Sequence, residues 1–224
     1  MGRNMPLDAA RGLAVFLMLI FHLAVDLEDF FGLATGYGYG WWQALRYFTA
    51  MLFISVSGWT AGAGAKGRAR RGAFRTLAGA LLVSAATYIF LGESYVRFGI
   101  LHFLSCALFL VPLLRGQSDF SLFLLAAFSA AAGWLLPGIN TDAAFLLPLG
   151  AMPRGFYSVD YYPLFPWLAV FIAGLSAGRR HAPLKARPCG NFAVKAAAFL
   201  GKRSLFIYLA HQPLFLLCLY ALMG

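Results

Sequence analysis

Charge is scarce in this chain: only 12% of its 224 residues are charged, whereas 61% are hydrophobic. A water-soluble domain has roughly 25% charged and 45–50% apolar residues, so the composition excludes a soluble globular protein. Cysteine is scarce as well. Cys106, Cys189 and Cys218 are widely spaced and odd in number, a pattern that indicates neither a disulfide framework nor a metal site.

The apolar residues form seven long runs. They cover about residues 9–30, 41–63, 75–92, 98–114, 119–136, 162–178 and 204–223. Because a helix needs about 20 apolar residues to cross a bilayer, these runs predict an all-α integral membrane protein. We expect about seven transmembrane helices in one bundle, a single domain over residues 1–224. Any function must then lie among the helices or on short loops.

Lys and Arg are distributed unevenly around these runs. With the N-terminus in the cytoplasm, all but Arg46, Arg97 and Arg154 of the 18 basic residues fall on the cytoplasmic side. Cytoplasmic loops of membrane proteins carry such an excess, so we expect the N-terminus inside and the C-terminus outside. This distribution also argues against nucleic acid as the partner of a chain whose net charge is +10.

Two of the predicted cytoplasmic segments, 64–75 and 179–203, are strongly basic. One interpretation is that they set the topology and attract anionic lipid headgroups. The other is that they bind a phosphorylated cytosolic donor, and the charge count leaves both open. The candidate phosphate contacts are Arg71, Arg75, Lys202 and Arg203.

Ionisable residues also lie within the first apolar run, where they are costly and indicate function. Arg11 and His22 are about three helical turns apart, so they share one face and lie about 16 Å apart along the axis. Asp8 and Asp26 stand at contact spacing from Arg11 and His22 respectively. We expect a cation that holds phosphate at the cytoplasmic end and a base with its carboxylate toward the outer half.

A structural interpretation of the same residues stays open. In it, His22 is a buried histidine bonded to a neighbouring helix, and Asp8 with Arg11 forms a cap. His102 and His211 have the same two interpretations, a helix-to-helix hydrogen bond or catalysis. Pro213 frees a backbone carbonyl near His211, which a polar partner would satisfy.

Glycine and proline predict packing and a cap. The pairs Gly58/Gly62 and Gly174/Gly178 have the spacing typical of close helix packing. Segment 137–161 is rich in proline, which prevents a regular helix, and we expect it to cap the outer mouth, where an acceptor would stack. The aromatic residues of this region are Phe145, Phe156, Tyr157, Tyr161 and Tyr162.

Four blocks of the sequence resemble known membrane acyltransferases. Residues 7–14 read LDAARGLA and are followed by His22, similar to the Arg, ten residues and His of the acyltransferase type 3 family. The other blocks are RFGILHF at 97–103, DYYPLFPW at 160–167, and GKRSL at 201–205 with Tyr208, His211, Gln212 and Pro213. Together they resemble a narrower family, the heparan-α-glucosaminide N-acetyltransferase catalytic domain and its small bacterial members.

The resemblance implies a transferase that passes an acyl group, typically acetyl, from cytosolic acetyl-coenzyme A to an amine or hydroxyl of an extracytoplasmic sugar. It places the chain in a bacterial inner membrane, and no metal is expected. Arg11, beside Asp8, would contact donor phosphate, and His22 would be the catalytic base. Asp26, His102 and Asp160 would line the acceptor site, and Asp26 and His102 complete the expected catalytic set with His22. The further residues that we expect to bind the acceptor are Tyr161, Tyr162, Trp167 and Arg97. A homodimer is the common default for such a chain.

One departure from the family and two other functions stay open. The lysosomal relatives place an essential histidine in the loop between the first two helices, whereas residues 32–42 contain none. Either His22 performs that task, or the chemistry and the acceptor differ. A proton-coupled small-solute transporter would use His22 and Asp26 as a relay, although no inverted halves are visible. In a non-catalytic membrane partner subunit, the histidines would hold helices together.

Overall fold

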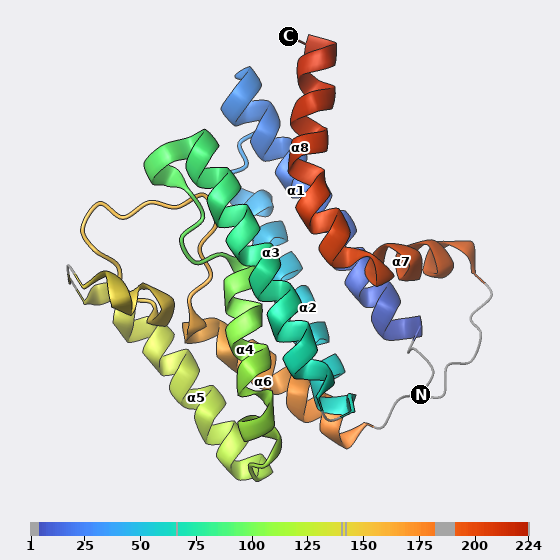
Figure 1. Cartoon of the computed structure of the whole chain (residues 1–224), viewed down its shortest axis with the longest axis vertical. Coiled ribbons are helices and arrows are strands. Elements are labelled where there is room, and N and C mark those ends of the chain that lie inside the picture. The colour runs from blue at the N-terminus through green and yellow to red at the C-terminus, as the bar shows by residue number, and fades with distance from the viewer. Residues whose placement is uncertain (1–4, 66, 140, 142, 182–190, 224) are drawn as a thin grey trace. The chain divides into compact units, whose positions relative to one another are not determined.

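Each apolar run predicted above forms a helix. The computed structural model describes residues 5–65, 67–139, 141, 143–181 and 191–223. Cys189 and parts of segments 64–75 and 179–203 lie outside them. The helices of the runs are α1 (Met5–Phe31), α2 (Gly40–Ala63), α3 (Arg68–Leu91), α4 (Ile100–Arg115), α5 (Asp119–Leu135), α6 (Leu164–Arg180) and α8 (Ser204–Met223) (Figure 1). Short 3-10 turns are η1 (Gly92–Ser94), η2 (Leu136–Gly138) and η3 (Ala144–Leu149).

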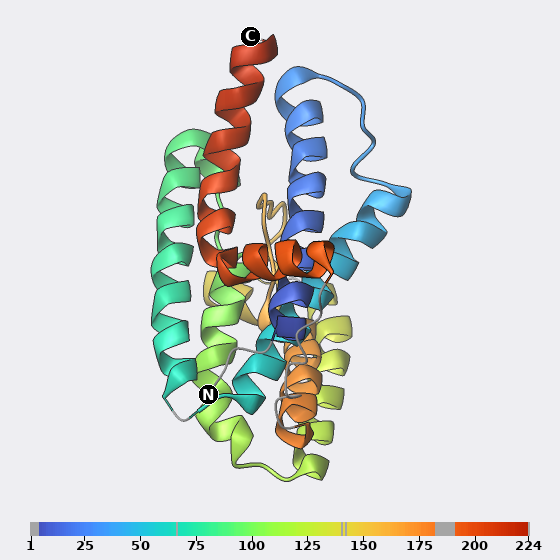
Figure 2. The same cartoon turned by 90° about the vertical axis from the view of Figure 1, so that its right-hand side faces the viewer.

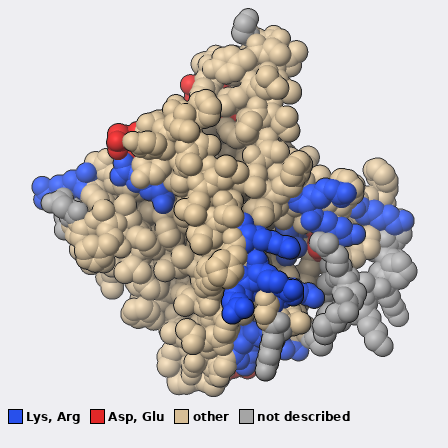
Figure 3. Space-filling model, viewed as in Figure 1, with Lys and Arg blue, Asp and Glu red and all other residues tan. Residues whose placement is uncertain are grey.

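The surface is apolar to an extent that requires a membrane. Among the described residues, four stretches are long and apolar enough to cross one, namely Met5–Phe31, Arg68–Ser94, Asp119–Gly138 and Ser204–Met223, and α4 is apolar but shorter. Phe90 and Trp134 are each 84% exposed, and most of the face in Figure 3 is uncharged. Soluble proteins do not expose such continuous apolar surface, which indicates an integral membrane protein. The total of seven spans and the cytoplasmic N-terminus stay predictions.

The chain divides into two compact units, Met1–Val56 with Pro183–Gly224, and Ser57–Ala182. The first unit holds α1, α8 and a helix that the sequence analysis did not expect, α7 (Phe192–Lys202). Asn191 caps α7 by accepting a hydrogen bond from the backbone N–H of Ala193 at 2.9 Å. Figure 2 shows α7 crossing α1, with α8 running along α1. At 11 residues, α7 is too short to be recognised as a transmembrane run.

Two glycines bring the backbones of α1 and α7 into contact. A Cβ atom added to Gly12 would lie 1.7 Å from the carbonyl oxygen of Ala197. One added to Gly201 would lie 1.8 Å from the carbonyl oxygen of Asp8. Both distances are far shorter than van der Waals contact, so any larger residue forces the two helices apart.

The second unit also packs its helices through glycine. In it, α3 contacts α4, α5 contacts α6, and α4 contacts α6. The last turns of α2 lie against α6, because a Cβ atom on Gly58, Gly62 or Gly178 would be 2.2 Å from a carbonyl oxygen of the facing helix. The close packing predicted for these three glycines is therefore confirmed, and Gly174 is buried.

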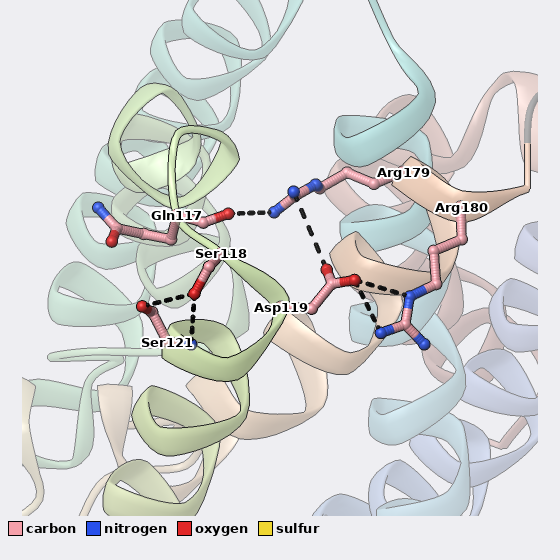
Figure 4. A network of polar contacts seen from close by, with 6 residues as sticks. All are labelled: Gln117, Ser118, Asp119, Ser121, Arg179 and Arg180. Carbon is pink, nitrogen blue, oxygen red and sulfur yellow. Dashed lines mark hydrogen bonds and ion pairs between the residues drawn. The ribbon is translucent and has the colours of Figure 1, made fainter.

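Charged side chains tie the start of α5 to the end of α6 (Figure 4). One carboxylate oxygen of Asp119 lies 2.9 Å from Arg180 Nη2, and the other lies 3.9 Å from Arg179 Nη2. Arg179 also donates to the carbonyl oxygen of Gln117 at 2.8 Å, and Ser118 caps α5. Ser118 thereby satisfies one of the free backbone N–H groups where α5 begins.

The crossing of α1 and α7 generates a stability prediction. We expect Gly201→Ala to lower the free energy of unfolding by about 1–3 kcal/mol, the usual range for overpacking. The melting temperature in detergent, followed by tryptophan fluorescence, measures this loss. Gly38→Ala is the matched control, because a Cβ atom there would meet nothing within 4 Å. A Gly201→Ala protein as stable as the Gly38→Ala protein would contradict the crossing.

Candidate active site

One face of α1 is less exposed than the other. It carries Asp8, Arg11, Val15, Met18, His22 and Asp26, which we call the polar stripe. Asp8, Val15 and Asp26 are buried, whereas Leu13 and Phe16 on the other face are 45% and 50% exposed. Arg11 and His22 are partly buried and belong to the same stripe. The spacing on which their shared face was predicted is therefore realised in one continuous helix.

Among the described residues, one ring nitrogen of His22 makes a hydrogen bond and the other makes none. Its Nδ1 lies 2.9 Å from the carbonyl oxygen of Met18, one turn earlier in α1. Because a carbonyl oxygen only accepts hydrogen bonds, Nδ1 of the neutral ring carries the hydrogen and Nε2 keeps its lone pair. The geometry thus leaves Nε2 of His22 available as a proton acceptor.

His211 of α8 meets His22 edge to face. The ring centroids are 4.7 Å apart and the ring planes are inclined at 85°. Nδ1 of His211 donates to the carbonyl oxygen of Tyr208 at 2.6 Å, so Nε2 again holds the lone pair. His211 is only 6% exposed, and its Nε2 has no hydrogen-bond partner among the described residues.

A second contact between the same helices lies beside the two imidazoles. Gln212 Nε2 donates a hydrogen bond to Oδ1 of Asp26, which is fully buried. In the part of the chain that the structure describes, Asp26 Oδ2 and Gln212 Oε1 have no partner. The cluster of His22, Asp26, His211 and Gln212 thus offers several buried, unsatisfied polar atoms to a ligand, and we call it the histidine cluster.

The cations predicted to hold the donor fall in both units. Arg11 Nη1 lies 3.4 Å from Asp8 Oδ1, at the start of α1. Since Gly201 touches the Asp8 backbone, the exposed Lys202 and Arg203 at the end of α7 lie next to this pair. The guanidinium of Arg203 covers the Phe199 ring at 3.9 Å. The other two candidates, Arg71 and Arg75, are exposed on α3 in the second unit.

His102 belongs to the second unit, and both its ring nitrogens make hydrogen bonds. Its Nδ1 accepts a hydrogen bond from the backbone N–H of Gly99 at 3.2 Å. Nε2 therefore carries the hydrogen, and it lies 3.4 Å from Ser84 Oγ. This arrangement fits the helix-to-helix interpretation of His102, while its predicted catalytic role stays a prediction.

The predicted acceptor residues of the second unit contact other parts of that unit, and Asp160 contacts the start of α4. Asp160 Oδ2 accepts a hydrogen bond from the backbone N–H of Ile100 at 3.0 Å. Tyr161 donates to the carbonyl oxygen of Leu147 at 2.7 Å, and burial raises the pKa of its hydroxyl to about 12. The rings of Tyr162 and Trp167 are 5.0 Å apart.

A cavity of about 310 Å³ opens beside Arg97 in the same unit. Arg97 pairs with Glu93 at 2.9 Å, and its guanidinium lies over the ring of Phe156 at 5.5 Å. Tyr157 also lines the cavity and is 61% exposed. Aromatic residues of segment 137–161 thus do line a cavity. Within the described residues, no group of three or more His, Cys, Asp and Glu side chains is arranged to hold a metal ion.

The fold and the histidine cluster define a helical integral membrane protein with ionisable groups buried among its helices, a class in which such groups perform chemistry or transport. The sequence model of one family, described as heparan-alpha-glucosaminide N-acetyltransferase, catalytic, matches residues 3–213. The chain belongs to this family, which confirms the resemblance and indicates a membrane acetyltransferase. No curated protein and no solved structure matches the chain.

The sequence predicts only one half of this cluster. It leaves His211 with two interpretations, outside the expected catalytic set, and Gln212 appears only in a block that resembles the family. The sequence does carry a signal for this half of the cluster, because two polar residues, His211 and Gln212, precede Pro213 inside an apolar run.

The bond to Ile100 predicts a structural role for Asp160. We expect Asp160→Ala to lower the free energy of unfolding by about 1–3 kcal/mol, because a helix N-terminus loses a charged acceptor. Asp160→Asn retains a carbonyl oxygen at the same place and should keep most of the stability. Melting temperatures of the two variants measure the difference. Equal melting temperatures for Asp160→Ala and the unaltered protein would contradict this role.

Proposed function

We propose that this chain transfers an acetyl group from cytosolic acetyl-coenzyme A to an amine or hydroxyl of an extracytoplasmic sugar. The observation that supports it most is the contact of His22 with His211, two histidines whose Nε2 atoms are free to accept protons, in a chain of an acetyltransferase family. The match over residues 3–213 includes most of both units, which supports a single domain of that activity.

The transfer itself needs a base and a place for charge. His22 Nε2 removes the proton from the acceptor nucleophile as that atom attacks the thioester carbonyl. The C–S bond then breaks, and the leaving thiolate takes the proton from the imidazolium, which restores the neutral ring. Asp26, one turn further along α1, stabilises the transient positive charge on His22.

The donor lies along α1 in this proposal. Arg11, with Lys202 and Arg203 beside it, binds the phosphates of coenzyme A near the cytoplasmic surface. His22 is about 16 Å further along the helix, a length comparable to an extended phosphopantetheine arm. Arg71 and Arg75 supply further positive charge for the nucleotide, and Asp8 orients Arg11.

The acceptor meets the outer residues of the chain. We assign Asp160, Tyr161, Tyr162, Trp167 and Arg97 to this side, together with His102. The cavity beside Arg97 and its aromatic lining support a site where a sugar ring stacks. The proposal includes seven spans, a cytoplasmic N-terminus, a bacterial inner membrane, contact with its lipids, and a homodimer.

Loss of the base tests the proposal. We expect His22→Ala to lower the turnover number about 10²- to 10⁴-fold, the usual contribution of a general base. Release of coenzyme A thiol by protein in lipid nanodiscs measures turnover, and the melting temperature shows that the variant is folded. Normal turnover by folded His22→Ala protein would remove His22 from the mechanism.

The donor end gives a separate prediction. We expect Arg11→Gln to weaken acetyl-coenzyme A binding about tenfold or more, because one charge-assisted phosphate contact is lost. Isothermal titration of acetyl-coenzyme A into detergent-solubilised protein measures the affinity. Lys195→Gln serves as control, because Lys195 is an exposed residue of the same unit to which we assign no contact with the donor. Equal affinities of the two variants would overturn the donor assignment.

A further inference from the structure

We infer that His211 is a second catalytic residue of the site, a base that deprotonates the acceptor amine before His22 acts. This inference rests on the proposed acetyl transfer. His211 stands in contact with the proposed base across the α1–α8 contact, with 4.7 Å between the ring centroids. It comes from the opposite end of the chain.

The hydrogen bonds of His211 differ from those of a structural histidine. His102 in this chain engages both ring nitrogens, one with Gly99 and one with Ser84. His211 engages Nδ1 alone, and its buried Nε2 has no partner among the described residues. A buried polar atom without a partner is unfavourable, and a substrate proton donor would satisfy it.

Contacts on both sides hold the His211 ring in place. Its Nδ1–H is held by the Tyr208 carbonyl one turn earlier, and the ring of Phe215 lies edge-on one turn later at 6.0 Å. Gln212, the next residue, donates to Asp26 and so joins α8 to α1 at this level. Gln212 is therefore a positioning residue, whereas His211 presents the reactive atom.

Two bases suit the proton balance of an amine acceptor. An amine enters as an ammonium ion and must lose one proton to free its lone pair, then a second as the C–N bond forms. His211 Nε2 takes the first proton and passes it to water, and His22 Nε2 takes the second. The C–S bond breaks, and the leaving thiolate takes the proton from His22. A hydroxyl acceptor loses one proton only and needs one base.

The test compares variants of the full chain in nanodiscs, with acetyl-coenzyme A and glucosamine as substrates. His211→Asn keeps an amide N–H near the position of Nδ1 but has no basic nitrogen. We expect it to lower the turnover number about 10²-fold near neutral pH, with an unchanged KM for acetyl-coenzyme A and an unchanged melting temperature. Added imidazole should restore part of the turnover of His211→Ala.

The pH profile separates a base from a structural residue. As the pH rises through the pKa of the amine, solution supplies free amine, so the His211→Asn defect should shrink while the His22→Ala defect persists. The titratable groups around His211 are Tyr208 of α8 and His22 and Asp26 of α1, and the charges of Arg46 and Asp29 act on His22 and Asp26 respectively. Each variant keeps all of these groups except the histidine that it replaces. The comparison of the two pH profiles therefore cancels the effects of the shared groups.

The possible results separate a failure of this inference from a failure of the proposed function. His181→Asn, an exposed histidine in the second unit, is the matched control and should keep full turnover. Wild-type turnover by His211→Asn would overturn the inference and leave the proposed function intact. So would a defect that neither imidazole nor high pH relieves, because the role would then be structural. Absence of thiol release from acetyl-coenzyme A by the unaltered protein with glucosamine would overturn the proposed transfer and the inference with it.

Discussion

Helices that cross a bilayer meet no water in its core, so the polar side chains on them must find partners inside the protein. Asp26 is completely buried near the end of α1, in an apolar run where a lone carboxylate is costly. Gln212 on α8 supplies the hydrogen bond that this carboxylate requires. The contact between His22 and His211 lies beside this bond, one turn back along α1 and one residue back along α8.

The crossing of α1 and α7 positions α8 for the contact between His22 and His211. Gly12 and Gly201 bring two backbones together, and the chain turns at Arg203 from α7 into α8. α8 starts next to the crossing and runs along α1. His22 lies ten residues after Gly12, and His211 lies ten residues after Gly201, so the two histidines meet at a similar distance from the crossing. A packing constraint made of glycine thereby sets the register of a polar site made of histidine.

Much of this arrangement was predictable, because it is encoded locally. The apolar runs predicted their helices, since length and hydropathy of a transmembrane segment depend on neighbouring residues alone. The spacing of Arg11 and His22 predicted a shared face for the same reason. The helix α7 was not predicted, because it is short, lies in a basic stretch and owes its position to glycine contacts with α1.

The sequence by itself determined the membrane setting, the helical runs, the polar stripe of α1 and the family to which the chain belongs. Only the tertiary structure decided which histidine faces His22. Asp26 and Gln212 are 186 residues apart, and no local period specifies a partner at that distance. His102 and His211 look alike as histidines in apolar runs, yet the first has both nitrogens bonded and the second has one without a partner among the described residues. That difference arises from the side chains and backbone that surround each ring once the helices have packed.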